Sequence, residues 1–209
     1  MEKVRVLEAQ LQRSESMRLE VLTLLGARGM PLDSLQFSEE AMVLAAATGQ
    51  RLAAYMEEKL WSRLGVEGDA FWLVDASETE LAFCGLNARL RDYARFGLLC
   101  LNEGRNFRDQ QILPARWIRD SIAPNRFHLM PGADNPGSSH PHGYGYHWWL
   151  PPGEPRLWLA AGFGSQLLVI EPESSVVVVV TSTLESKGET WDRRVLERVR
   201  ELARTVSSG

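Results

Sequence analysis

The apolar residues in the last third of the chain fall in short runs that glycine and proline separate. These runs cover 144–150, 157–161, 166–170 and 176–182, and Pro151-Pro152-Gly153 and Glu171-Pro172-Glu173 supply turns between them. Short apolar runs between turn signals are typical of successive strands in a sheet. The pattern therefore predicts an antiparallel meander over 144–182.

A helical period follows the predicted meander. Apolar side chains recur three or four residues apart over 189–206, at Trp191, Val195, Val199, Leu202 and Val206. Such a stripe predicts an amphipathic helix that packs across one face of the sheet.

The middle of the chain is predicted to be mostly helical. Its expected elements are a helix over 39–47 with Ser38 as N-cap, a helix over 51–63, a short strand or buried connector over 70–74, a helix between Asn87 as N-cap and Gly104, a short helix over 114–122 and an irregular loop over 123–142. Together with the meander, these elements predict an α+β fold in which helices flank an antiparallel sheet.

The first residues also have a helical period. Val4, Leu7, Leu11, Val21 and Leu25 fit three- and four-residue spacing, whereas Ser14 and Arg18 interrupt the stripe. We therefore expect an amphipathic helix over 2–27 that docks on another surface, rather than a coiled coil. The expected division is residues 1–34 as this helix and a linker, and residues 35–209 as the main domain.

Composition excludes several classes of function. The formal net charge is −4, which gives no electrostatic reason to expect nucleic acid or an anionic membrane as a partner. No segment has the ~20 apolar residues that a membrane helix needs. The N-terminus lacks the apolar run of a signal peptide, so the sequence as written predicts a cytoplasmic protein, and an exported ancestor is also compatible with it. We expect Cys84 and Cys100 to be buried free thiols, and no cofactor.

Three segments carry a family resemblance: Gly143-Tyr-Gly-Tyr-His-Trp-Trp149, Ala161-Gly-Phe-Gly-Ser-Gln166 and Asn87-Ala-Arg-Leu-Arg-Asp-Tyr-Ala-Arg-Phe-Gly97. They resemble the serine β-lactamase-like hydrolases, which include class C β-lactamases, DD-peptidases, esterases and 6-aminohexanoate-dimer hydrolases. The likeness extends over about 35–206 and implies the C-terminal portion of a β-lactamase/DD-peptidase-like fold. It also implies acyl transfer on amides or esters by a serine that a lysine and a tyrosine activate.

The residues that would carry this chemistry are largely missing. No Ser-x-x-Lys motif occurs in the sequence. Phe37-Ser38-Glu39 matches the family's Tyr-x-Asn, and Phe37 lacks the phenolic oxygen that moves a proton. Ala160-Ala161-Gly162 matches the family's Lys-Thr-Gly, which places the backbone N–H of Phe163 at the oxyanion position.

The resemblance implies a residual pocket wall at the turn between two strands, facing the proline-rich loop before His142. Its candidate residues are Ala161, Gly162, Phe163, Gly164, Ser165, Gln166 and Tyr146. Glycines here would let a small amide, ester or carboxylate approach the backbone closely.

Other candidate sites have simpler interpretations. His128, His140, His142 and His147 lie close in sequence, yet no fourth zinc ligand accompanies them, so we predict no metal site. Ser138-Ser139 lacks the Gly-x-Ser-x-Gly elbow, and Ser165 is a turn residue. Tyr144, Tyr146, Trp148 and Trp149 are expected to be core and sheet-face residues, and the alternative of a ligand-stacking platform rests on composition alone.

Three hypotheses of function remain open. The chain is a truncated or degenerate hydrolase homologue that is inactive alone, a non-catalytic binding module, or the C-terminal half of a split hydrolase that another chain completes. A missing front portion would leave a sheet edge open, and an open edge favours self-association or a complementing strand.

Overall fold

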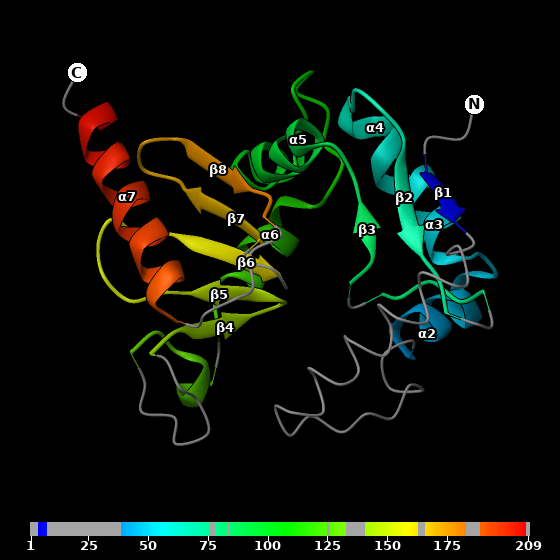
Figure 1. Cartoon of the computed structure of the whole chain (residues 1–209), viewed down its shortest axis with the longest axis horizontal. Coiled ribbons are helices and arrows are strands. Elements are labelled where there is room, and N and C mark those ends of the chain that lie inside the picture. The colour runs from blue at the N-terminus through cyan, green and yellow to red at the C-terminus, as the bar shows by residue number, and fades with distance from the viewer. Residues whose placement is uncertain are drawn as a thin grey trace. The chain divides into compact units, whose positions relative to one another are not determined.

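The computed structural model describes residues 4–7, 39–75, 78–82, 84–124, 126–132, 141–162, 166–182 and 189–207. The chain forms two compact units, residues 1–89 and 90–209 (Figure 1). The candidate site lies in the second unit.

The first unit combines a three-stranded sheet with helices. Its elements are β1 (Val4–Leu7), α2 (Glu39–Thr48), α3 (Leu52–Met56), the π-helical segment η2 (Glu57–Trp61), α4 (Ser62–Leu64), β2 (Ala70–Leu73) and β3 (Leu86–Asn87). Strand β2 is central, parallel to β1 and antiparallel to β3. Gly49 and Gly65 have φ values of 71° and 80°, a left-handed conformation open to glycine, and they follow the ends of α2 and α4.

A buried carboxylate fixes the start of α3. Glu80 is 3% exposed, and its Oε1 accepts hydrogen bonds from Arg51 Nε at 3.1 Å and from the backbone N–H of Ala53 at 3.4 Å. The negative charge therefore lies at the N-terminus of a helix, where the helix dipole stabilises it.

Two expectations about this unit are wrong. Residues 4–7 form strand β1 rather than part of a helix, because pairing with β2 overrides the local apolar period. Asn87 pairs with Phe71 in the sheet and does not cap α5. The segment 70–74, for which strand and connector were both open, forms β2. Residues 8–38 lie outside the described part of the chain, so the expected helix beyond Leu7 and the boundary at 34 stay predictions.

The second unit contains the predicted meander. Its elements are α5 (Leu90–Leu101), α6 (Ala115–Ser121), the 3₁₀ segment η3 (Phe127–Leu129), β4 (Gly143–Gly145), β5 (Trp148–Leu150), β6 (Trp158–Gly162), β7 (Gln166–Glu171), β8 (Val176–Val180) and α7 (Glu189–Ser207). The five strands are antiparallel neighbours in chain order. The predicted single strand over 144–150 is instead a hairpin, because the chain turns at Tyr146 and His147.

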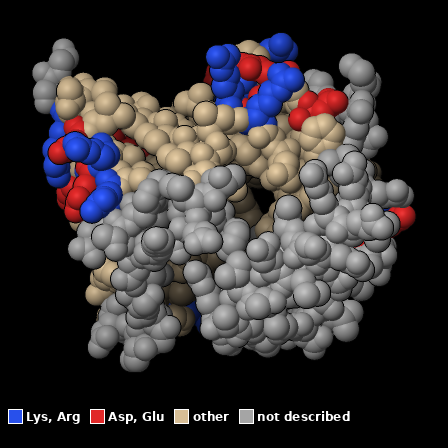
Figure 2. All heavy atoms as spheres, in the orientation of Figure 1, with Lys and Arg blue, Asp and Glu red and all other residues tan. Residues whose placement is uncertain are grey.

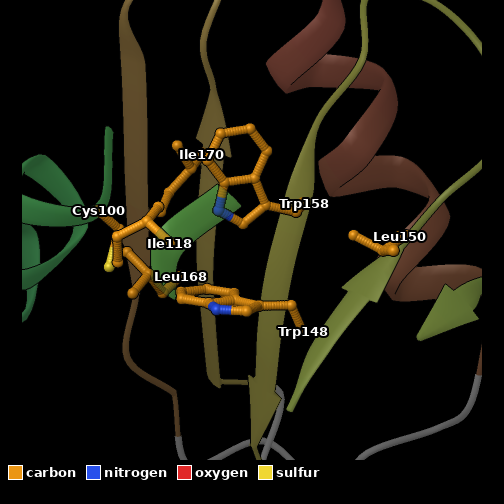
Figure 3. Close-up of a cluster of buried hydrophobic side chains, with 7 residues drawn as sticks. All are labelled: Cys100, Ile118, Trp148, Leu150, Trp158, Leu168 and Ile170. Atoms are coloured by element: carbon orange, nitrogen blue, oxygen red, sulfur yellow. The ribbon is translucent and has the colours of Figure 1, made fainter. Parts of the chain in front are cut away.

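Alternate residues of strands β5 to β8 pack into two separate cores. Figure 3 shows the core on one face, where the indoles of Trp148 and Trp158 point from β5 and β6 towards Ile118 of α6. The buried residues of this core are Cys100, Ile118, Trp148, Leu150, Trp158, Leu168 and Ile170. The core on the other face contains Leu157, Leu159, Leu167, Val169, Leu196 and Val199. Helices α5 and α6 therefore cover one face of the sheet and α7 covers the other (Figure 1).

The packing of α7 across one face confirms the prediction, but the expected stripe is wrong in part. Leu196, Val199 and Ala203 are buried, whereas Leu202 and Val206 are about half exposed. A helix repeats every 3.6 residues, so a face centred on Leu196 and Val199 turns Leu202 away from the sheet.

The two cysteines differ in environment. Cys100 is buried in the core beneath α5, as expected, whereas Cys84 is exposed, which corrects the prediction that both are buried. Although the residue Cys84 is exposed, desolvation of its sulfur raises the pKa of its thiol to about 11. Deeper burial raises the pKa of Cys100 to about 12.

Candidate functional site

The predicted pocket wall lies at one end of the five-stranded sheet. Strands β6 and β7 pair from Trp158 opposite Ile170 to Gly162 opposite Gln166. Ala161, Gly162 and Gln166 are exposed, in contrast to the buried residues at the other end of the same strands. Phe163, Gly164 and Ser165, which connect the two strands, lie outside the described residues, so their roles stay predictions.

Gly162 is exposed, and the described residues around it do not require glycine. Among them, a Cβ atom at this position would first meet the Cβ of Gln166 at 3.5 Å, an ordinary van der Waals distance. A glycine at the end of a strand leaves its backbone uncovered, so a small molecule can approach β6 here.

The hairpin between β4 and β5 ends at the same end of the sheet. Strand β5 runs away from Tyr146 and His147, and β6 runs back antiparallel to it, with Trp149 opposite Leu159. Tyr146 and His147, which form the turn of this hairpin, therefore lie at the same end of the sheet as Gly162 and Gln166.

A close backbone contact and an unusual backbone angle define this hairpin. A Cβ atom at Gly145 would fall 2.0 Å from the carbonyl oxygen of Ser121, so only glycine lets the hairpin approach the last residue of α6. His147 has a φ of 63°, in the left-handed region that few residues other than glycine adopt and in which asparagine, aspartate and histidine are enriched. Sparsely populated backbone conformations occur often at functional sites.

Aromatic rings surround the hairpin. Tyr144 contacts Trp149 edge to face at a centroid distance of 4.7 Å, and its hydroxyl lies 3.4 Å from Nδ1 of His147. The ring of Tyr146 lies 5.1 Å from that of Trp117 on α6. Of the four aromatic residues expected in the core or on a sheet face, Trp148 is buried, whereas Tyr146 is 54% exposed and does not fit that interpretation.

Sequence reasoning missed two features of this end of the sheet. Trp117 stands in a predicted short helix whose exposed face cannot be identified from seven residues. The sequence predicts His147 in a strand, because the Tyr-His pair carries none of the Asn-Gly or Asp-Gly signals of a two-residue hairpin.

The remaining candidates stay apart or unassigned. His128 and His147 are exposed and His142 is half-buried, and no group of three or more His, Cys, Asp or Glu that could hold a metal ion occurs among the described residues. Phe37, Ser138, Ser139 and His140 lie outside them. The described ends of the proline-rich loop meet where the N–H of Gly132 donates to the carbonyl of Pro141. No helix in the described segments is long and apolar enough to cross a membrane.

Comparisons with known proteins agree with this architecture. The chain is similar to a protein described as a 6-aminohexanoate-dimer hydrolase from Bacillus anthracis, with 30% identity and a TM-score of 0.70 over 82% of this chain and 42% of that one. The simvastatin synthase LovD from Aspergillus terreus shares the fold at 13% identity, with a TM-score of 0.58 over 100% of this chain and 66% of that one. The chain thus spans less than half the length of the hydrolase. A β-lactamase family profile matches residues 41–201, most of the sequence, and the chain therefore belongs to the β-lactamase family.

Proposed function

We propose that this chain is the sheet-bearing part of a β-lactamase-related serine hydrolase, and that by itself it binds small amide, ester or carboxylate ligands without forming an acyl-enzyme. The observation that carries the proposal is that the sequence holds no Ser-x-x-Lys motif. Met56 and Leu184 stand three residues before Lys59 and Lys187. Acyl transfer in this family needs a serine whose proton a neighbouring lysine and tyrosine accept.

The environment of Lys59 supports this proposal. Its ammonium donates a hydrogen bond to the carboxylate of Glu58, and it lies 5.7 Å from the centre of the Tyr55 ring. The hydrogen bond and charge of Glu58 raise the pKa of Lys59. The side chain is half exposed and stays protonated at neutral pH, so it does not act as the general base of a nucleophile.

Weak ligand binding at the β6–β7 turn is the activity that remains. Ala161, Gly162 and Gln166 carry no charge and are exposed, so a neutral amide or ester can reach the strand ends without displacing an ion pair. The resemblance assigns the oxyanion N–H to Phe163, and this donor needs no particular side chain. One such donor contributes a few kcal/mol only against a developing oxyanion, so we expect weak binding of a ground-state carbonyl.

Covalent labelling tests the proposal. The protein is incubated with a fluorophosphonate and, separately, with a penicillin, and its intact mass is measured after each. We expect no added mass on this protein. The protein described as a 6-aminohexanoate-dimer hydrolase from Bacillus anthracis is treated with the same probes for comparison. Stoichiometric addition that disappears when Ser138, Ser139 or Ser165 is replaced by alanine would contradict the proposal.

The edge of the sheet favours a second candidate, a split hydrolase that another chain completes. Strand β8 is the last strand of its sheet in the described part of the chain, and its five residues are all valine. Figure 2 shows charged side chains gathered over α7 and in a second cluster, with uncharged surface over β8 between them. Edge strands that remain unpaired usually carry charge, proline or a bulge, and β8 carries no charge and no proline.

Hydrogen exchange distinguishes the two candidates. In an antiparallel edge strand, alternate amides bond to the neighbouring strand and the others point outward. We expect alternating protection along Val176–Val180 in the isolated chain. If all five amides are protected, and the protection grows with protein concentration, β8 pairs with β8 of another copy. If all five amides are protected only when a Ser-x-x-Lys-bearing chain is added, the protein is a split enzyme.

A further inference from the structure

We draw no further inference here: the strongest candidate, the exposed pair of aromatic rings that Trp117 of α6 and Tyr146 of the β4–β5 hairpin form, carries none, because nothing in the part of the chain that the structure describes shows what covers it.

Discussion

Gly97 of α5 lies directly against Val177 of β8, because a Cβ atom at position 97 would fall 2.6 Å from Cγ1 of Val177. The same atom would fall 2.8 Å from Cδ1 of Leu168 on β7. Helix α5 therefore reaches the sheet at a point where no side chain fits between them, and it covers β8, the last of the strands that the structure describes in this sheet.

Replacement of Gly97 by alanine should destabilise the second unit. The added methyl group overpacks a filled core, which typically costs about 1–3 kcal/mol. Urea unfolding of Gly97→Ala, Val177→Ala and the double variant measures the coupling, and removal of the valine methyls should recover part of the loss. Gly162→Ala is the control, because a Cβ atom there would meet Gln166 only at an ordinary van der Waals distance of 3.5 Å. It should change the free energy of unfolding by less than about 0.5 kcal/mol.

Glu171 should be a stabilising residue of the β7–β8 turn. Its side chain is fully buried, and its oxygens accept hydrogen bonds from the backbone N–H groups of Glu173 at 2.7 Å and Ser174 at 2.9 Å. Glu171→Ala leaves two backbone donors without this acceptor and should lower the free energy of unfolding by about 2–3 kcal/mol in urea titrations. An equal effect of Glu173→Ala, whose side chain is exposed, would contradict this assignment.

Both thiols should react slowly below pH 9. With a thiol pKa of about 11, roughly one Cys84 side chain in a thousand is a thiolate at pH 8. Iodoacetamide should therefore modify Cys84 at a rate that rises about tenfold per pH unit up to pH 11. Cys100 should react only after unfolding. Mass spectrometry of Cys84→Ser and Cys100→Ser variants assigns the rates, and rapid labelling of Cys84 at pH 7 would show that its sulfur is not desolvated.

The same shifts predict the sign of the pH dependence of stability. The folded state raises the thiol pKa values above their ordinary value of 9.0, so it holds these protons more tightly than the unfolded state. This contribution to stability is complete below pH 9 and is lost as the pH rises towards 11 and 12. Replacement of both cysteines by serine should flatten the fall in unfolding free energy above pH 9.

Glycine in place of His147 should not destabilise the hairpin, whereas valine should. The φ of 63° is available to glycine without strain and is unfavourable for a β-branched residue. Thermal unfolding should rank the variants His147→Gly, wild type and His147→Val in order of decreasing stability. A His147→Val variant as stable as the wild type would show that the Tyr144 contact, rather than the backbone, determines the effect.

The sequence predicts this fold well where long-range and local signals agree. The runs at 166–170 and 176–182 are flanked by turn residues and by a helix of clear period, and they form β7, β8 and α7. The prediction fails at 4–7, where pairing with a strand 66 residues away determines the structure. It also fails at 144–150, because a run of Gly, Tyr and Trp that turns through His147 carries no turn signal.

The candidate site is less predictable than the fold. Exposure of Gly162 and Gln166 follows from a strand pattern that becomes polar at one end, so it could be expected. The contact between Trp117 and Tyr146 joins two segments 29 residues apart through the fit of Gly145 against Ser121. No periodicity encodes such a contact, because it depends on the absence of a single Cβ atom.

The burial of both faces of the sheet has a consequence for how the strands find their alignment. A slip of β7 by one residue would exchange Leu168 and Ile170 with Leu167 and Val169, and a slip of β8 would exchange valine for valine. Hydrophobicity therefore cannot distinguish the correct alignment from its neighbour in these two strands. The Glu171 carboxylate can, because it meets the N–H groups of Glu173 and Ser174 only when the turn closes at that residue. In this hairpin, one polar side chain specifies the pairing that the nine apolar residues of the ladder leave ambiguous.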